Sequence, residues 1–224
     1  MFDRLISLIG ENNFQKIQSK KIVILGLGGV GSYALEGLIR SGVIDVVIID
    51  KDIIDITNLN RQLMTNQNNI GLNKTDVLEN RIKNINPNCK VKKVTEFINV
   101  NNLNLIFDEN PDFVIDCIDT IKTKEYLIKE CLKRKIKFIS SMGMGNKMDA
   151  TRVKITDLSK TSYDKIAKNL RIFVKKEKIK GKIPVVFSDE LPYKTGIVAS
   201  NASVPGVAGL IIANYVINKI IKEK

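Results

Sequence analysis

Short apolar runs alternate with longer amphipathic segments along most of the chain. Strands are predicted at 21–26 (KIVILG, short and buried), 43–50 (VIDVVIID), 89–97 (CKVKKVTEF, alternating), 113–119 (FVIDCID) and 137–142 (KFISSM). Helices are predicted near 4–17, 30–41, 72–84 and 122–135, with a polar loop over 51–69. Because strands and helices alternate with short connections, we expect an α/β fold with a doubly wound, Rossmann-like, mostly parallel sheet.

The last third of the chain has a different pattern. A strand at 152–158, a lysine-rich helix, a strand at 184–189 and an apolar helix over 204–217 follow one another. No flexible linker precedes them. We therefore predict a single adenylating-type domain over 1–224, with a nucleotide-binding core at 1–150 and a C-terminal α+β extension at 151–224. The run at 204–217 is read as a buried helix without stable membrane insertion; a membrane-associated helix is the alternative.

Composition excludes several kinds of catalysis. The 224 residues include no histidine, so Ser-His-Asp and Cys-His mechanisms and His-ligated metals are excluded. Three cysteines without a CxxC pair, and no signal peptide, predict a cytoplasmic protein. The net charge is +12. Residues 151–182 carry eleven bases against three acids, which suits a polyanion partner or a solvated helix face.

A glycine-rich turn follows the first strand. Gly26, Gly28 and Gly31 form GxGxxG between a strand and a helix, and Gly29 allows still closer approach of a ligand. Such a turn presents backbone N–H groups and a helix dipole to phosphate, although a tight strand–helix turn also needs glycine. Asp50 ends the second strand 19 residues after Gly31, where a carboxylate binds ribose hydroxyls.

Further charged residues do not fit an NAD site. Arg61 follows the ribose acid closely, and Lys74 lies in the first turn of the next predicted helix. Asp119 follows the fourth strand, at the ligand-binding edge of such sheets. One acid among phosphates is typical of a Mg²⁺ ligand. Each residue alone suits a charged surface, but the set favours ATP with Mg²⁺ over NAD.

Several motifs together resemble the ubiquitin-activating-enzyme-like (ThiF/MoeB/HesA) family. They are GLGGVGS, D-x-D-x-x-x-x-x-N-x-N-R-Q, GLNKTDV and CIDT. The segments FDRLISLIGENN, RIKNINPNCKV, SSMGMGNKMDATRVKITDLSKT, PVVFSDE and SVPGVAGLIIANYVI resemble one bacterial branch. That branch acts on tRNA bearing threonylcarbamoyladenosine. The resemblance implies adenylation of the threonyl carboxylate, followed by ring closure with net loss of water.

The resemblance also implies residue roles. The glycine turn with Gly29 would hold the triphosphate, Asp50 the ribose, and Asp119 the metal. Asn58, Arg61, Gln62 and Lys74 would complete the nucleotide site, and Arg61, Lys74, Asp119 and Arg4 the catalytic set. Arg4 matches an arginine that reaches the neighbouring subunit's ATP in related enzymes, which implies a homodimer. A sulfur-transfer protein is a further partner that the sequence leaves open.

The sequence departs from the bacterial branch at three points, and four alternative functions remain open. Cys117 stands where alanine is usual in the branch, Ala150 where proline is usual, and the loop 191–202 is short. The cysteines are predicted to be buried small hydrophobes. The alternatives are an adenylyltransferase acting on a Gly-Gly-ended sulfur carrier, an NAD-dependent oxidoreductase, a non-catalytic RNA-binding scaffold and a Rossmann-like domain without further function. The missing CxxC pairs disfavour the first, and Arg61 and Lys74 the second.

Overall fold

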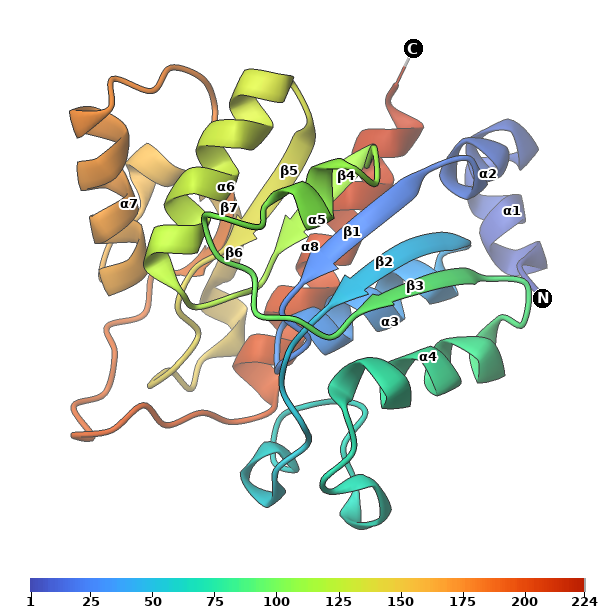
Figure 1. Ribbon diagram of the computed structural model, residues 1–224, viewed down its shortest axis with the longest axis horizontal. Helices are drawn as coiled ribbons and strands as arrows, with labels where there is room; N and C mark the ends of the chain where they lie inside the picture. The colour runs from blue at the N-terminus through green and yellow to red at the C-terminus, as the bar shows by residue number, and fades with distance from the viewer. Residues whose placement is uncertain (224) are drawn as a thin grey trace.

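The computed structural model describes residues 1–223, which fold around one seven-stranded sheet (Figure 1). The strands are β1 (Lys21–Leu25), β2 (Asp45–Ile49), β3 (Lys90–Val94), β4 (Phe113–Asp116), β5 (Lys137–Ser141), β6 (Val153–Asp157) and β7 (Pro184–Ser188). Their order is β3-β2-β1-β4-β5-β7-β6. All pairs are parallel except β6 with β7, which is antiparallel. The predicted fold class is confirmed.

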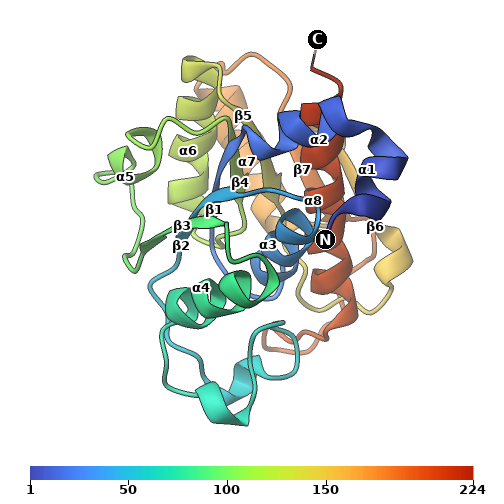
Figure 2. The same cartoon turned by 90° about the vertical axis from the view of Figure 1, so that its right-hand side faces the viewer.

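Helices cover both faces of the sheet (Figure 2). They are α1 (Asp3–Ile9), α2 (Glu11–Gln18), α3 (Gly31–Arg40), α4 (Lys74–Ile85), α5 (Asn104–Phe107), α6 (Ile121–Arg134), α7 (Lys165–Lys176) and α8 (Ser203–Ile221). One core lies between the sheet and α2, α3, α4 and α8, and a second lies between the sheet and α5, α6 and α7. Alternate residues of the buried strands therefore contribute to opposite cores.

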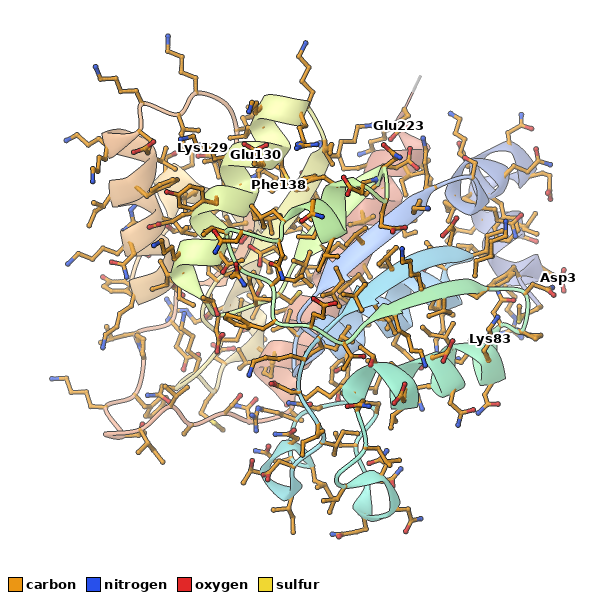
Figure 3. The ribbon with its side chains drawn as sticks, in the orientation of Figure 1. Asp3, Lys83, Lys129, Glu130, Phe138 and Glu223 are labelled. Carbon is orange, nitrogen blue, oxygen red and sulfur yellow. The ribbon has the colours of Figure 1, made fainter. Side chains whose placement is uncertain are left out.

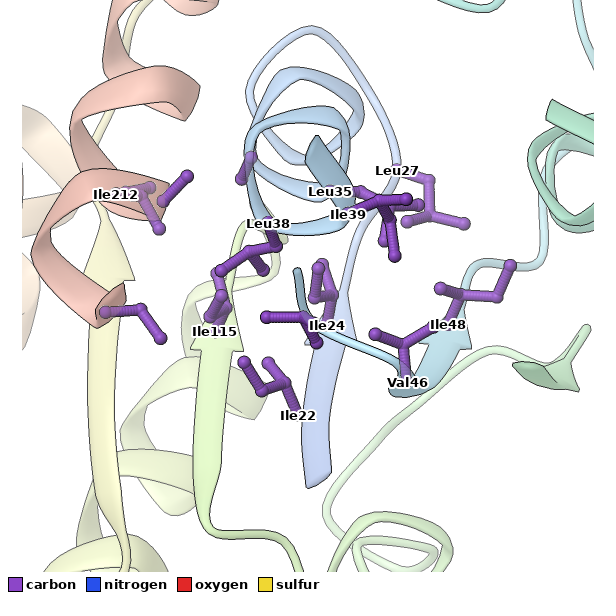
Figure 4. Close-up of a cluster of buried hydrophobic side chains, with 14 of the residues drawn as sticks. Ile22, Ile24, Leu27, Leu35, Leu38, Ile39, Val46, Ile48, Ile115 and Ile212 are labelled. Atoms are coloured by element: carbon purple, nitrogen blue, oxygen red, sulfur yellow. The ribbon is translucent and has the colours of Figure 1, made fainter. Parts of the chain in front are cut away.

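The first core shows why the central strands form where they do. Ile22 and Ile24 of β1 and Ile115 of β4 face Leu38 of α3 and Ile212 of α8 (Figure 4). These side chains are almost completely buried. Burial of such a side chain contributes about 1.5–3 kcal/mol relative to exposure. A strand that is covered on both faces is a continuous run of apolar residues, and for this reason β1, β2 and β4 can be predicted from the sequence.

Three details of the predicted elements differ from the structure. The helix expected over 4–17 is two helices, because Gly10 at φ 81° interrupts it. The short helix α5 was not expected. The strand expected over 113–119 ends at Asp116, where the pairing with β1 and β5 ends, so Cys117 and Asp119 belong to the following loop.

Helix α8 is the apolar helix expected near the end of the chain. It extends to Ile221 and buries ten of its residues. By length and composition it is the one helix of the described residues that qualifies to cross a membrane, yet 56% of the tested window is buried in the fold. The interpretation as a core helix is therefore confirmed. Just beyond its end, Glu223 pairs with Lys20 and Lys137, which closes the C-terminus onto the sheet (Figure 3).

Candidate active site

A cavity of about 480 Å³ opens at the carboxyl edge of the parallel strands. Its walls are the glycine turn after β1, the loops after β2, β3 and β4, and the first residue of α4. Doubly wound sheets bind ligands at this edge, where the connections diverge to opposite faces. Nine of the eleven sequence-predicted site residues line the cavity: Gly26, Gly28, Gly29, Asp50, Asn58, Arg61, Gln62, Lys74 and Asp119.

The glycine turn is shaped by two close backbone approaches. A Cβ on Gly26 would lie 2.7 Å from the carbonyl oxygen of Cys117, and the residue has φ 81°. A Cβ on Gly31 would lie 1.8 Å from the carbonyl oxygen of Gly26, so Gly31 shapes the turn without lining the cavity. Within residues 1–223, the backbone N–H groups of Gly28 and Gly29 donate no hydrogen bond. They are thus available to an anionic ligand.

Asp50 is fixed between the turn and the next loop. Its Oδ2 accepts a hydrogen bond from the Leu27 N–H at 2.6 Å, and its Oδ1 accepts one from the Asp52 N–H at 2.8 Å. A carboxylate has lone pairs beyond these two bonds. The side chain therefore has a preset orientation and retains acceptor capacity for hydroxyl groups in the cavity.

The loop after β2 carries three of the predicted residues. Asn58 is buried, and its Oδ1 accepts from the Asp55 N–H in a reciprocal capping arrangement. Arg61 donates through its Nη1 to the Thr57 carbonyl at 2.8 Å, which directs the guanidinium along the cavity wall. Gln62 is 6% exposed, and its Oε1 is the one buried side-chain polar atom of the described residues without a partner. A ligand in the cavity would supply that partner.

Lys74 is held by an acid that sequence reasoning missed. Its side chain is buried, and its Nζ lies 2.9 Å from Oδ2 of Asp52. Partial burial acts to raise the pKa of Asp52, but the hydrogen bond and charge of Lys74 outweigh it, so the pKa is lowered. The D-x-D spacing of Asp50 and Asp52 was a signal for this second acid.

Asp119 lies exposed at the cavity rim. No hydrogen bond or ion pair holds its carboxylate in the part of the chain that the structure describes, and no group of three or more acids, cysteines or histidines there is placed to hold a metal ion without other ligands. Glu96, in the loop after β3, is a second exposed carboxylate of the cavity lining, and it too has no hydrogen bond or ion pair among the described residues. Mg²⁺ in nucleotide sites typically takes one or two carboxylates together with phosphate oxygens and water, so this donor set fits it.

A buried ion pair underlies the loop that carries Asp119. Lys124 of α6 lies 2.8 Å from Asp116 at the end of β4, and both side chains are at most 2% exposed. The hydroxyl of Ser140 donates to Asp116 at 2.6 Å and accepts from Lys124 at 3.1 Å. The Ile118 N–H donates to Asp116 as well, so this cluster orders the residues that lead to Asp119.

Arg4 lies away from the cavity, and Cys117 is less buried than the sequence predicts. Arg4 follows Asp3 on the outer helix α1 and does not line the cavity (Figure 3). Cys89 and Cys131 are buried as expected. Cys117 is only partly buried and forms part of the cavity wall, because the strand ends one residue before it. Burial of the thiol nevertheless raises the pKa of Cys117 to about 12, so it is not a thiolate at neutral pH.

The chain belongs to the ThiF family, whose model matches residues 2–224. It is 42% identical to the tRNA threonylcarbamoyladenosine dehydratase of Bacillus subtilis (strain 168), over 99% of this chain and 95% of that protein. It is 35% identical to the protein of the same name from Haemophilus influenzae, over 95% of this chain and 90% of that one.

Among solved structures, too, a protein of this name is similar to the chain. The crystal structure of Escherichia coli tRNA N6-threonylcarbamoyladenosine dehydratase in complex with ATP matches with a TM-score of 0.93 at 33% identity. The match covers 98% of this chain and 93% of that one. An E. coli MccB structure matches with a TM-score of 0.67 at 23% identity, a likeness in fold alone.

Proposed function

We propose that this chain cyclises N6-threonylcarbamoyladenosine in tRNA in an ATP-dependent reaction that removes water. The single observation that carries the proposal is the cavity, where free N–H groups, a ribose-directed carboxylate, three cations and the unpaired carboxylate of Asp119 converge. The similarity to the Bacillus and E. coli proteins over nearly the whole chain supports the particular substrate.

In the first proposed step, an oxygen of the threonyl carboxylate attacks the α-phosphorus of ATP. The bond from that phosphorus to the pyrophosphate oxygen breaks, and an acyl-adenylate forms. Gly28 and Gly29 would bind the phosphates through their N–H groups, while Asp50 would accept hydrogen bonds from the ribose. Arg61 and Lys74 would neutralise charge that grows on the leaving pyrophosphate. Gln62 and Asn58 would complete the nucleotide contacts.

In the second proposed step, the carbamoyl group attacks the activated carbonyl carbon of the same nucleoside. A ring forms, a proton is released and AMP leaves with the bond electrons. The nucleophile and electrophile belong to one molecule, so holding the ring-closing geometry supplies much of the rate. Neither step needs histidine, which this chain lacks.

Two further elements belong to the proposal. Asp119 would hold Mg²⁺, which would supply charge neutralisation at the phosphates. Arg4 lies in the first turn of the outer helix α1, away from its own cavity, so in a homodimer it would reach the partner's site instead. We also propose a cytoplasmic location and a C-terminal extension that faces the tRNA. Docking of a sulfur-transfer protein remains a hypothesis of the sequence alone.

Pyrophosphate release tests the proposal directly. The purified chain is incubated with ATP, Mg²⁺ and tRNA that bears the modified adenosine, and the tRNA is then digested and analysed by mass spectrometry. We expect tRNA-stimulated release of pyrophosphate and a nucleoside that is lighter by the mass of one water. Stimulation by a Gly-Gly-ended carrier protein alone would identify a sulfur-carrier adenylyltransferase instead.

Two site variants sharpen this test. Arg61→Ala and Asp119→Ala are expected to abolish cyclisation without unfolding the protein, because neither side chain is part of a core. Asp108→Asn is the matched control, since this exposed acid does not line the cavity. Full activity of either alanine variant would contradict the assignment of the site.

A further inference from the structure

The segment between β7 and α8 presents apolar side chains to solvent. We call residues 191–202 the rim loop. Four of its residues are large, apolar or aromatic, and strongly exposed: Leu191 at 68%, Tyr193 at 58%, Ile197 at 74% and Val198 at 87%. Exposed apolar residues that are contiguous along one loop commonly mark a binding surface.

The rim loop is held in a defined shape by Asn146. The Asn146 side chain donates to the carbonyls of Tyr193 and Ile197 and accepts from the Ala199 N–H. Its backbone N–H donates to Ala199, and its carbonyl accepts from Tyr193. Asn201 adds a bond to the carbonyl of Lys147 at 2.9 Å. The exposed side chains are therefore presented by an organised backbone, which lowers the entropy that binding must overcome.

The rim loop lies beside the nucleotide-binding loops. The Asn60 side chain donates to the Ser200 carbonyl at 3.0 Å, and Asn60 is the neighbour of Arg61. Directly after the loop, Pro205 is 3.2 Å from the position that a Cβ on Gly29 would take. Figure 1 shows the segment running along the edge of the sheet where the carboxyl ends of the strands lie. A substrate that enters the cavity from this edge passes the rim loop.

The charge of the rim loop favours an anionic partner. Both acids at its base are occupied: Asp189 pairs with Arg152 and Lys154, and Glu190 accepts from the N–H groups of Met148 and Asp149. Lys194 is the one charged residue from 191 to 202.

A basic helix begins at the same edge. Asp164, which caps α7, accepts from the Gly143 N–H in the loop after β5. Lys165 and Lys168 follow on the exposed side of that helix. An exposed aromatic ring, on a loop whose one charged residue is a lysine and beside the start of a basic helix, is the chemistry that binds single-stranded nucleic acid.

We propose that the rim loop binds unpaired bases of the tRNA anticodon loop beside the modified adenosine, with the ring of Tyr193 as the stacking surface. The proposal rests on the proposed function, because it names the surface that receives the same substrate. Tyr193 is 58% exposed, and among the described residues its ring makes no aromatic pair and lies under no cation, which leaves ring surface for a base.

The test compares Tyr193→Ala with Tyr193→Phe. Initial rates of pyrophosphate release are measured against tRNA concentration at saturating ATP, and binding of a fluorescent anticodon stem-loop is measured without ATP. We expect Tyr193→Ala to raise the KM for tRNA and the stem-loop Kd by about tenfold. The kcat at saturating tRNA and the KM for ATP stay unchanged, and Tyr193→Phe stays within about twofold of wild type because it keeps the ring.

A second variant tests the backbone shape of the rim loop rather than the Tyr193 ring. Asn146 has φ 59°, so Asn146→Gly keeps its backbone conformation while removing the three side-chain bonds. It is expected to raise the KM for tRNA as well. Equal KM values for tRNA in wild type and Tyr193→Ala would overturn the rim-loop proposal. A change of oligomeric state in Tyr193→Ala would also overturn it, because a second copy of the chain would then be what binds the rim loop. A wild-type enzyme without tRNA-stimulated pyrophosphate release would instead overturn the proposed function.

Discussion

Replacing Lys124 by methionine would break the buried ion pair beneath the site. The change leaves the Asp116 carboxylate almost fully buried, with Ser140 and the Ile118 N–H as its remaining donors. Removing one partner of a buried pair costs about 3–5 kcal/mol, because the other charge stays desolvated without compensation. For a chain of this size, each kcal/mol shifts the melting temperature by about 2–4 °C, so we expect a loss of roughly 6–20 °C.

The assay is urea unfolding followed by fluorescence or circular dichroism, together with a thermal melt. Lys129→Met is the matched control: the Lys129–Glu177 pair lies at 2.9 Å, but its side chains are 42% and 33% exposed. Such a surface pair contributes about 0–1 kcal/mol. Lys129 lies within the second half of α6, next to Glu130 (Figure 3).

A double variant separates charge pairing from packing. Lys124→Met combined with Asp116→Leu removes both charges, and replacing a buried pair with apolar residues is often close to neutral. We expect the double variant to be more stable than Lys124→Met alone. A loss below about 1 kcal/mol for Lys124→Met, similar to the control, would refute the reasoning that the pair is a buried electrostatic anchor. Among folded variants, a raised KM for ATP is expected, because Asp116 orders the loop before Asp119.

Three shorter predictions concern charge, thiols and pH. Lys168→Glu with Lys175→Glu on α7 should weaken tRNA binding and reduce its log–log salt slope by about 0.7–0.9 per lost phosphate contact; an unchanged slope would make this helix a solvated face. Because burial raises the pKa of Cys117 to about 12, iodoacetamide at pH 8 should leave this thiol intact in the native protein, and rapid labelling by mass spectrometry would contradict that. The folded-state pKa of Asp52 is lowered below 3.8, so its stabilising effect is present above pH 3.8 and lost as the pH falls through the folded-state pKa. Asp52→Asn should therefore unfold at lower urea than wild type at pH 7, with the difference gone in strong acid; an equal difference at both pH values would exclude this linkage.

The sequence predicted most of the nucleotide-binding half because its signals are local. Buried parallel strands are apolar runs, and the turn between β1 and α3 needs glycine at two close backbone contacts. Helix breaks are harder to predict, since Gly10 within an amphipathic run is compatible with either one helix or two. The antiparallel direction of β6 follows from tertiary pairing with β7 and has no local signature.

The missed residues of the site depend on register and loop course. Asp116 and Ser140 are partners across β4 and β5, and Lys124 reaches them from the following helix. No spacing in the sequence predicts that these three side chains contact one another. Lys74 was predicted to face phosphates, but its pairing with Asp52 depends on how the loop after β2 returns to α4. Long-range pairs of this kind can be identified only from the three-dimensional structure.

The contact between Asn60 and Ser200 has a consequence for how the protein is made. The two residues are 140 positions apart, and Pro205 packs beside Gly29 across a still larger separation in the chain. A ribosome adds about 5–20 residues per second, so the glycine turn emerges many seconds before the segment that borders it. The early half of the sheet can form during synthesis, but Asn60 and Gly29 gain these two contacts only after Ser200 and Pro205 have left the ribosome. Full nucleotide-binding competence should therefore appear late, and a nascent chain stalled before residue 200 should bind ATP more weakly than a chain that includes Ser200 and Pro205.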